Sequence, residues 1–205
     1  MASDHYFSAE PQAEAKSYPI EFEVAGQTIK ALGASGTFSA NKLDAGTRVL
    51  LNLHANFPSR GRVLDLGCGW GPISLALASQ SPELEVLAVD VNQRSLAQTA
   101  ENAASLGLTN VSTSLESDMS DGQIFDQIWS NPPIRVGKEV LHALMEKYLP
   151  MLAFGGSAWM VVQKQLGAES FQKWLTERFR GFEVERVAND KGYRVLRVTR
   201  LPKSQ

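Results

Sequence analysis

The sequence predicts an α/β fold: a seven-stranded, mostly parallel sheet with helices on both faces and an antiparallel hairpin at the C-terminal end. Three observations lead to this prediction. Short apolar runs alternate with stretches of helical periodicity from residue 62 to residue 179, which is typical of parallel strands joined by helices. A glycine-rich turn follows the first apolar run. Two alternating runs then flank Asn189-Asp190-Lys191-Gly192, residues that favour a turn between antiparallel strands.

The residues before this alternation predict a smaller N-terminal unit. Residues 1–16 show little periodicity and are expected to form a disordered or frayed tail. Residues 17–58 are expected to form a flap in which a β-hairpin precedes a helix. Apolar residues at helical spacing extend that helix from Leu43 to Phe57, and Pro58 ends it.

The main sheet and its helices are expected over residues 59–205. The length of 205 residues makes a single domain the natural expectation. The strands are expected at residues 63–66, 86–91, 111–115, 125–130, 157–163, 182–188 and 193–199, and the helices at residues 72–78, 93–105, 138–149 and 170–179.

The composition, with 43% apolar and 20% charged residues, is that of a soluble globular protein, and a cytoplasmic location is expected. No apolar run approaches the roughly 18 residues of a membrane span, and the polar N-terminus does not resemble a signal peptide. A single cysteine, Cys68, excludes an intramolecular disulfide and suits a reducing compartment. The three histidines are scattered, so no metal site is expected. A monomer is the simplest expectation.

The charge is unevenly distributed along the chain. Residues 1–150 hold 10 Lys and Arg against 17 Asp and Glu, whereas residues 151–205 hold 10 against 5. A basic C-terminal portion could face the phosphates of a nucleic acid. A solvated charged surface is the alternative on charge alone.

Three glycines alternate in the turn after the first core strand, at Gly67, Gly69 and Gly71. This is not the Gly-x-Gly-x-x-Gly spacing that seats a diphosphate on a helix N-terminus. Asp65, two residues earlier, could hold a cationic amine and would repel a diphosphate. Cys68 suits a small residue filling the turn. A tight strand–helix turn without a ligand is the alternative interpretation.

Acidic residues end the next two strands. Asp90, followed by Val91, could accept hydrogen bonds from both hydroxyls of a ribose; its alternative role is a helix cap. Asp118 could accept from the exocyclic amine of adenine, with Met119 packed on the ring, or could be an ordinary loop residue. S-adenosylmethionine contains an amino-acid amine, a ribose and an adenine. We therefore predict it as the cofactor, since such strand ends face one crevice.

The fourth core strand ends in Asn131-Pro132-Pro133-Ile134. Two prolines remove two amide donors, so this turn presents carbonyl groups, to which Asn131 adds a side-chain oxygen. Hydrogen bonds from both protons of a planar amine to Asn131 and the Pro132 carbonyl would hold its lone pair out of conjugation and toward a methyl donor. Catalysis is then mainly positioning and electrostatics, with a plain structural turn as the alternative.

These motifs resemble class I S-adenosylmethionine-dependent methyltransferases. Further motifs resemble the "methyltransferase small" domain of small-subunit ribosomal RNA guanine-N2-methyltransferases, over roughly residues 18–200. The matching segments are Asp65-Leu66-Gly67-Cys68-Gly69, Asp90, Asn131-Pro132-Pro133, Gly36-Thr37-Phe38-Ser39, Leu43-Asp44, Gly46-Thr47 and Lys191-Gly192-Tyr193-Arg194-Val195. The resemblance implies a Rossmann-like fold and a single methyltransferase domain over residues 17–205. It also implies that Phe38 and Thr47 close over the methionine end of the cofactor.

The activity implied by the resemblance is methyl transfer to the exocyclic amine of a guanine in RNA, with ribosomal RNA or a ribosomal subunit as partner. Two departures bear on the substrate. Ile134 occupies a position where the family usually has Phe or Tyr to stack on the base, and the ribosomal RNA enzymes typically carry a second, degenerate copy of the domain. Methylation of an adenine amine or a protein glutamine amide stays open, as does an inactive cofactor- or RNA-binding module. The glycine spacing disfavours a nicotinamide dehydrogenase.

Overall fold

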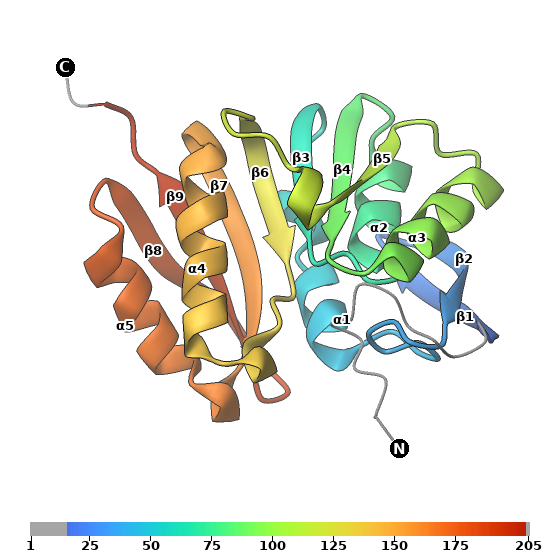
Figure 1. Ribbon diagram of the computed structural model, residues 1–205, viewed down its shortest axis with the longest axis horizontal. Coiled ribbons are helices and arrows are strands. Elements are labelled where there is room, and N and C mark those ends of the chain that lie inside the picture. Colours follow the sequence, from blue (N-terminus) through green and yellow to red (C-terminus); the bar gives the residue numbers. More distant parts are fainter. Residues whose placement is uncertain (1–15, 204–205) are drawn as a thin grey trace.

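A computed structural model describes residues 16–203 and contains the predicted seven-stranded sheet (Figure 1). The strand order is β5-β4-β3-β6-β7-β9-β8, in which β3 to β7 pair in parallel and β9 is antiparallel to both neighbours. The strands are β3 Gly61–Leu66, β4 Leu84–Asp90, β5 Val111–Leu115, β6 Phe125–Ser130, β7 Leu152–Gln163, β8 Phe182–Asp190 and β9 Tyr193–Arg200. The C-terminal hairpin is confirmed, with β9 inserted next to β7 and β8 at the edge.

Helices cover both faces of the sheet, as predicted. On one face, α4 and α5 pack in a single apolar cluster, and on the other α1 and α2 pack beside α3 (Figure 1). The alternation of buried side chains along the strands divides the core between these two faces. The helices of the core are α2 Pro72–Gln80, α3 Gln93–Ser105, α4 Lys138–Tyr148 and α5 Ala168–Arg178, with 3-10 turns η2 Glu116–Asp118, η3 Ile134–Val136, η4 Leu149–Met151 and η5 Lys164–Leu166.

The flap consists of a two-stranded sheet followed by a short helix, namely β1 Ser17–Val24, β2 Gln27–Ala34 and α1 Ala45–Leu51. The prediction of one helix as far as Phe57 was wrong, because α1 ends at Leu51 and a separate 3-10 turn, η1, covers His54–Asn56. Phe57 is extended, with ψ of 133°, as the residue before a proline prefers. The tighter turn still lets Phe57 pack edge-on against Trp129, at 4.9 Å between ring centroids.

The flap is fixed to the core rather than attached by its ends alone. The Asn102 side chain on α3 accepts from the Leu32 N–H and donates to the Leu32 carbonyl, both at 2.8 Å, so it continues the edge of β2. Phe22 packs edge-on against Trp70, at 5.8 Å between ring centroids. The Asn92 amide donates to the Gly36 carbonyl at 2.9 Å. These contacts hold the segment between β2 and α1 beside the carboxyl ends of the core strands.

Three further expectations concern the N-terminal tail, membrane spans and metal sites. The predicted tail lies outside the described residues except for Lys16, whose N–H donates to Ser35 Oγ at 2.9 Å. Among residues 16–203, no helix is long and apolar enough to cross a membrane. The same residues contain no group of three or more His, Cys, Asp or Glu side chains that could hold a metal ion.

Candidate active site

A cavity of about 600 Å³ opens at the carboxyl ends of β3, β4, β6 and β7, the edge where open α/β sheets bind ligands. Its β4 side is lined by Leu66, Gly67, Val89, Asp90, Val91, Ser95 and Glu116. Its β7 side is lined by Asn131, Pro132, Pro133, Ile134, Val136, Val140, Leu144, Gln163, Leu166 and Tyr193. Phe38 and Asp44 reach it from the flap. A hollow of about 20 Å³ adjoins it and adds Thr47, Cys68 and Gly69, among others.

Most residues predicted for the site line this cavity or the adjoining hollow. They are Phe38, Thr47, Gly67, Cys68, Gly69, Asp90, Val91, Asn131, Pro132, Pro133 and Ile134. Four predicted residues line neither of the two, namely Asp65, Gly71, Asp118 and Met119. Their places in the structure explain why.

The glycine turn after β3 directs its backbone N–H groups into the protein. Gly67 and Gly69 have φ of +77° and +59°, a region that favours glycine. The N–H groups of Gly67 and Cys68 both donate to the Val89 carbonyl, at 2.8 and 3.0 Å. The Gly69 N–H donates to Asp90 Oδ2 at 2.9 Å. A diphosphate would be bound by such N–H groups, so the turn suits a ligand that lacks one.

The first and last glycines of the turn have different roles. A side chain at Gly67 would meet no atom within 4 Å, because Gly67 borders the open cavity. A side chain at Gly71, where φ is +92°, would lie 2.8 Å from Thr99 Cγ2 on α3. Gly71 therefore allows α3 to pack against the turn, whereas Gly67 leaves room for a ligand.

Asp65 is fully buried behind the turn. Its Oδ2 accepts from the Ser74 N–H at 2.9 Å and from Ser74 Oγ at 2.6 Å, in the first turn of α2. Its Oδ1 has no hydrogen-bond partner among the described residues. Burial raises the pKa of Asp65 from 3.8 to about 7, because a desolvated carboxylate is costly. A buried acid with one unsatisfied oxygen fits a site completed by a cation or a water molecule.

Asp90 ends β4 with its carboxylate at the cavity. Its Oδ1 accepts from the Asn92 N–H and its Oδ2 from the Gly69 N–H, both at 2.9 Å. Burial raises the pKa of Asp90, and the backbone hydrogen bonds oppose that rise. Asn92, not Asp90, caps α3, since its side chain accepts from Arg94 and Ser95. Because each carboxylate oxygen has a second lone pair, Asp90 can still accept from a ligand.

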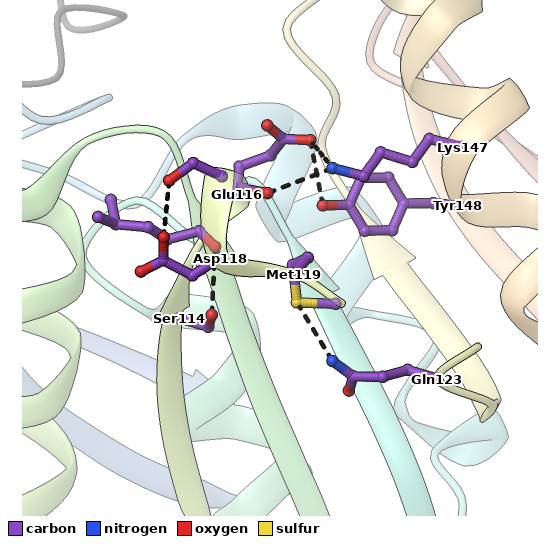
Figure 2. Close-up of polar contacts among 9 residues, drawn as sticks. Ser114, Glu116, Asp118, Met119, Gln123, Lys147 and Tyr148 are labelled. Carbon is purple, nitrogen blue, oxygen red and sulfur yellow. Dashed lines mark hydrogen bonds and ion pairs between the residues drawn. The ribbon is translucent and has the colours of Figure 1, made fainter. Parts of the chain in front are cut away.

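The structure brings Glu116, instead of Asp118, to the cavity. The η2 turn after β5 places Glu116 at the cavity wall and leaves the Asp118 side chain exposed, where it accepts from Ser117 Oγ at 3.0 Å. Met119 is buried in the core under α4, and its sulfur lies 3.9 Å from Gln123 Nε2. Figure 2 shows this turn and its neighbours.

Two side chains of α4 hold one oxygen of the Glu116 carboxylate. Lys147 Nζ lies 2.5 Å from Glu116 Oε1, and the Tyr148 hydroxyl lies 3.4 Å from the same oxygen (Figure 2). Burial, with the Glu116 charge, raises the pKa of Tyr148. Glu116 Oε2 accepts no hydrogen bond from the described residues. The carboxylate is thus oriented by one oxygen and has the other available.

On the β7 side, the proline turn presents oxygen atoms. Pro133 has φ of −75° and ψ of 72°, an inverse γ-turn, in which the Ile134 N–H donates to the Pro132 carbonyl at 2.8 Å. Asn131 Nδ2 donates to Asp44 Oδ2 at 3.1 Å and to Thr47 Oγ1 at 3.0 Å. Asn131 Oδ1 accepts no hydrogen bond from the described residues.

Sequence reasoning missed several cavity residues that come from distant segments. Asp44 was named within a segment that resembles the family but not as a site residue, and in the structure it also caps α1, where its Oδ2 accepts from the Gly46 N–H at 3.0 Å. Gln163 ends β7 and pairs in register with Tyr193 of β9. A polar residue ending an apolar strand was the available signal for Gln163. No local pattern indicated Glu116, since its orientation depends on the η2 turn.

Cys68 is buried beneath the adjoining hollow, with its sulfur 3.6 Å from Thr99 Oγ1. Burial raises the pKa of the Cys68 thiol, and the charges of Asp90 and Asp65 add to the rise. A thiol held neutral in this way is a poor nucleophile. Cys68 therefore fills the turn and does not form a reactive centre.

The fold and the site together define a Rossmann-like protein for a nucleoside-containing ligand without a diphosphate. The unsatisfied Asp65 oxygen, the open space at Gly67 and the carboxylate of Asp90 fit the amine, the chain and the ribose of S-adenosylmethionine. The model of the methyltransferase small domain matches residues 28–197, and the chain belongs to this family of S-adenosylmethionine-dependent methyltransferases.

Two relatives show how far the similarity extends. The uncharacterized protein YbxB of Bacillus subtilis (strain 168) is 36% identical over 202 residues, which cover 97% of this chain and 100% of the relative. Ribosomal RNA small subunit methyltransferase C of Salmonella typhi is 31% identical over 195 residues, which cover 92% of this chain and 54% of the relative. This chain therefore spans about half the length of the ribosomal RNA methyltransferase it matches.

A solved structure agrees with the fold. The T. thermophilus 16S rRNA N2 G1207 methyltransferase RsmC, solved in complex with AdoMet and guanosine, superposes with a TM-score of 0.74 at 24% identity. The match covers 93% of this chain and 52% of that chain. The likeness supports the Rossmann-like architecture along nearly the whole chain.

Proposed function

We propose that this protein transfers the methyl group of S-adenosylmethionine to the exocyclic N2 amine of a guanine in RNA, with ribosomal RNA as the substrate. The observation that carries the proposal is the Asn131 side chain. Its Oδ1 accepts no hydrogen bond from the described residues, and Asn131 lines both the cavity and the adjoining hollow. A carbonyl acceptor between a cofactor site and a second, open side is suited to an amine substrate.

Asn131 and Pro132 would orient that amine. Its lone pair is delocalised into the base, so the amine is a poor nucleophile until its protons are held. Asn131 Oδ1 would accept from one proton and the Pro132 carbonyl from the other, through the lone pair that the Ile134 N–H leaves. Pro133 keeps the turn rigid. The bound cofactor supplies an electrophilic sulfonium methyl group, and the residues contribute by positioning the amine.

The β4 side would hold the cofactor. Asp90 would accept from the ribose hydroxyls, and the adenine would lie over Val91. The methionine end would lie near Gly67 and Cys68, beneath Phe38 and Thr47 of the flap. The predicted adenine contacts of Asp118 and Met119 require a rearrangement of the η2 turn, whereas Glu116 already lies at the cavity.

The β7 side would hold the base by apolar contact. Its lining includes five aliphatic side chains, namely Ile134, Val136, Val140, Leu144 and Leu166. Ile134 therefore stands among similar residues, and the aromatic stacking usual in the family is replaced by aliphatic contact. The exposed Lys138 and Lys164 lie within two residues of the lining residues Val140 and Gln163 in the sequence and would contact phosphates. The names of the Salmonella relative and of RsmC support ribosomal RNA as the acceptor, which would be methylated in the cytoplasm.

Methylation of ribosomal RNA from a strain that lacks the protein would test this proposal. Purified protein and methyl-labelled cofactor are incubated with naked 16S ribosomal RNA or with assembled small subunits, and the RNA is digested to nucleosides. Labelled N2-methylguanosine is the expected product. Label in an adenine or in a ribosomal protein would contradict the guanine assignment. Absence of binding of the demethylated cofactor by calorimetry would contradict the enzyme assignment.

A further inference from the structure

We propose that Asp44 and Thr47 of the flap are positioning residues, which fix the Asn131 side-chain amide so that its carbonyl oxygen faces the acceptor. This inference rests on the proposed function, because it specifies how the amine acceptor at Asn131 is oriented. Asp44 lies 87 residues from Asn131 in the sequence and Thr47 lies 84. The flap would thus complete the catalytic loop besides covering the cofactor.

The hydrogen bonds use both protons of the Asn131 amide. Nδ2 donates to Asp44 Oδ2 at 3.1 Å and to Thr47 Oγ1 at 3.0 Å, distances of ordinary N–H···O bonds. An NH₂ group has two donors and no acceptor. The amide nitrogen is therefore saturated on the flap side, and among the described residues Oδ1 has no hydrogen-bond partner.

The carboxylate of Asp44 decides which way the amide points. An ionised carboxylate only accepts hydrogen bonds, so it attracts the amide nitrogen and repels the amide oxygen. Rotation of Asn131 by 180° would set two oxygens against each other at about 3 Å and exchange a charge-assisted hydrogen bond for a repulsion. Thr47 alone would not distinguish the two orientations of the Asn131 amide, because a hydroxyl can donate as well as accept a hydrogen bond.

The wrong orientation would obstruct catalysis. With the amide rotated, Nδ2 would face the substrate amine, so that donors would oppose donors. The Pro132 carbonyl would then be the sole acceptor at the turn. The lone pair of the amine would remain conjugated with the base, and the methyl transfer would slow while the cofactor site stayed intact.

The scaffold around Asp44 and Thr47 keeps these acceptors in place. Asp44 Oδ2 also accepts from the Gly46 N–H at 3.0 Å, so the residue caps α1 while it holds Asn131. Thr47 is buried in α1. The next turn of the helix buries Val49 and Leu50 in the core. Neither acceptor can follow a moving amide, which suits a role in orientation.

Matched substitutions separate positioning from folding. Thr47→Val keeps the shape but removes the acceptor, whereas Thr47→Ser keeps the hydroxyl. Asp44→Ser keeps a good helix cap but is too short to reach Asn131, whereas Asp44→Asn can present its amide oxygen to both donors. We expect kcat to fall at least about tenfold in Asp44→Ser and by less in Thr47→Val, because the Asp44 carboxylate selects the orientation of the amide. The conservative variants Thr47→Ser and Asp44→Asn should keep most of the wild-type kcat.

The split between kinetic constants identifies the role. Positioning predicts that Asp44→Ser lowers kcat while the dissociation constant for the demethylated cofactor stays within about threefold of wild type, and that the melting temperature is unchanged in Thr47→Ser. If Asp44→Ser instead weakens cofactor binding and leaves kcat unchanged, Asp44 is a cofactor ligand and the inference is wrong. Full kcat in both Thr47→Val and Asp44→Ser would also overturn it.

A spectroscopic measurement tests the orientation without any substrate. In ¹⁵N-labelled protein, the side-chain amide signals of Asn131 are assigned by their absence in Asn131→Ala. Both amide protons should exchange slowly with water in wild type and in Thr47→Ser. In a double variant that carries both Thr47→Val and Asp44→Ser, they should exchange at least about tenfold faster. Fast exchange in wild type contradicts the inference. Because this result needs no methyl acceptor, it is independent of whether the guanine proposal holds.

Discussion

The β4 side and the β7 side of the cavity are constructed differently. On the β4 side, Asp65 and Asp90 lie at or next to the ends of two adjacent parallel strands, and the glycine turn donates backbone hydrogen bonds to the Val89 carbonyl and the Asp90 side chain of β4. On the β7 side, the wall is made of side chains from α4, the ends of β6 and β7, and the flap. The first wall is local in sequence, and the second is assembled by the tertiary fold.

Both walls expose aliphatic side chains at the opening. Val140 is 52% and Leu166 is 39% exposed on the β7 side, and Val91 is 42% exposed on the β4 side. Exposed aliphatic residues around an opening are suited to a large substrate that covers them. A ligand common to a whole family can be bound by a rigid backbone, while the acceptor is selected by side chains that differ between members. Variants on the two sides should therefore separate cofactor binding from turnover.

The largest effect is expected on the β7 side, from Asn131→Ala. Loss of the oriented carbonyl removes an interaction made mainly in the transition state, so kcat should fall about a hundredfold or more. The affinity for the demethylated cofactor, measured by calorimetry, should stay within about threefold. Unimpaired turnover in this variant would remove Asn131 from the mechanism and erase the functional difference between the two walls.

The next effect concerns stability on the β4 side and its dependence on pH. The pKa of Asp65 is about 7 in the folded protein, against 3.8 ordinarily. The folded state therefore binds a proton that the unfolded state has lost between about pH 4 and pH 7. Stability from this group is fully present below pH 4 and is lost as the pH rises to 7. Between pH 5 and 8, the free energy of unfolding should fall by about 2–3 kcal/mol through Asp65.

Urea denaturation of wild type and Asp65→Asn at several pH values measures this contribution as a difference between the two curves. The variant cannot titrate at this position, so its curve should be flatter. Asp121→Asn, at an exposed position, is the matched control and should follow wild type. Parallel curves for wild type and Asp65→Asn would mean that the buried carboxyl finds a compensating partner in solution.

A third effect should appear in cofactor binding alone, from Asp90→Ala. The substitution removes the proposed ribose acceptor and leaves the Gly69 and Asn92 N–H groups without their partner. We expect the dissociation constant of the demethylated cofactor to rise about 10- to 100-fold, the range for a hydrogen-bonded charge. At saturating cofactor, kcat should change less than in Asn131→Ala. A larger loss of kcat in Asp90→Ala than in Asn131→Ala would contradict the assignment of cofactor binding to the β4 side and of acceptor orientation to the β7 side.

How much of this site could be predicted from the sequence follows from the same contrast. Gly67 and Asp90 lie within one strand–helix–strand unit, whose geometry is fixed by parallel pairing, so their place at one cavity was predictable, whereas Asp65 is buried behind the turn. Asn131 was predicted from its place at the end of a core strand, before two prolines, and the structure pairs that strand with β3. The parallel sheet with helices on both faces was predicted as well, whereas its strand order, β5-β4-β3-β6-β7-β9-β8, comes from the structure. All of these inferences needed only contacts between neighbouring elements.

The other side of the site could not be predicted in this way. The bond between Asp44 and Asn131 joins segments 87 residues apart, and no spacing in the sequence encodes it. The end of α1 was misjudged because a 3-10 turn keeps the apolar spacing that a longer helix would have. The position of Glu116 depends on the three-residue turn η2, which brings Glu116 to the cavity and leaves Asp118 away from it. Side-chain direction in such turns follows from packing.

The smallest effect, and the sharpest test of the turn after β5, compares Glu116→Gln with Asp118→Asn. Glu116 lies at the cavity with Oε1 held by Lys147 and Tyr148, whereas Asp118 is exposed (Figure 2). If Glu116, which already lies at the cavity wall, accepts the hydrogen bond from the adenine amine, Glu116→Gln should raise the dissociation constant of the demethylated cofactor about fivefold. Asp118→Asn should change it less than twofold.

Lys147→Met is the control for this comparison, because it removes one of the two α4 partners of the Glu116 carboxylate and leaves the carboxylate itself in place. A dissociation constant between those of wild type and Glu116→Gln would show that the α4 contacts orient the acid that meets the cofactor. If Asp118→Asn has the larger effect, then the η2 turn rearranges when the cofactor binds and brings Asp118 inward. In that case the β4 side would not be the preformed wall that its backbone hydrogen bonds indicate, and the contrast with the β7 side would hold only for Asp65, Asp90 and the glycine turn.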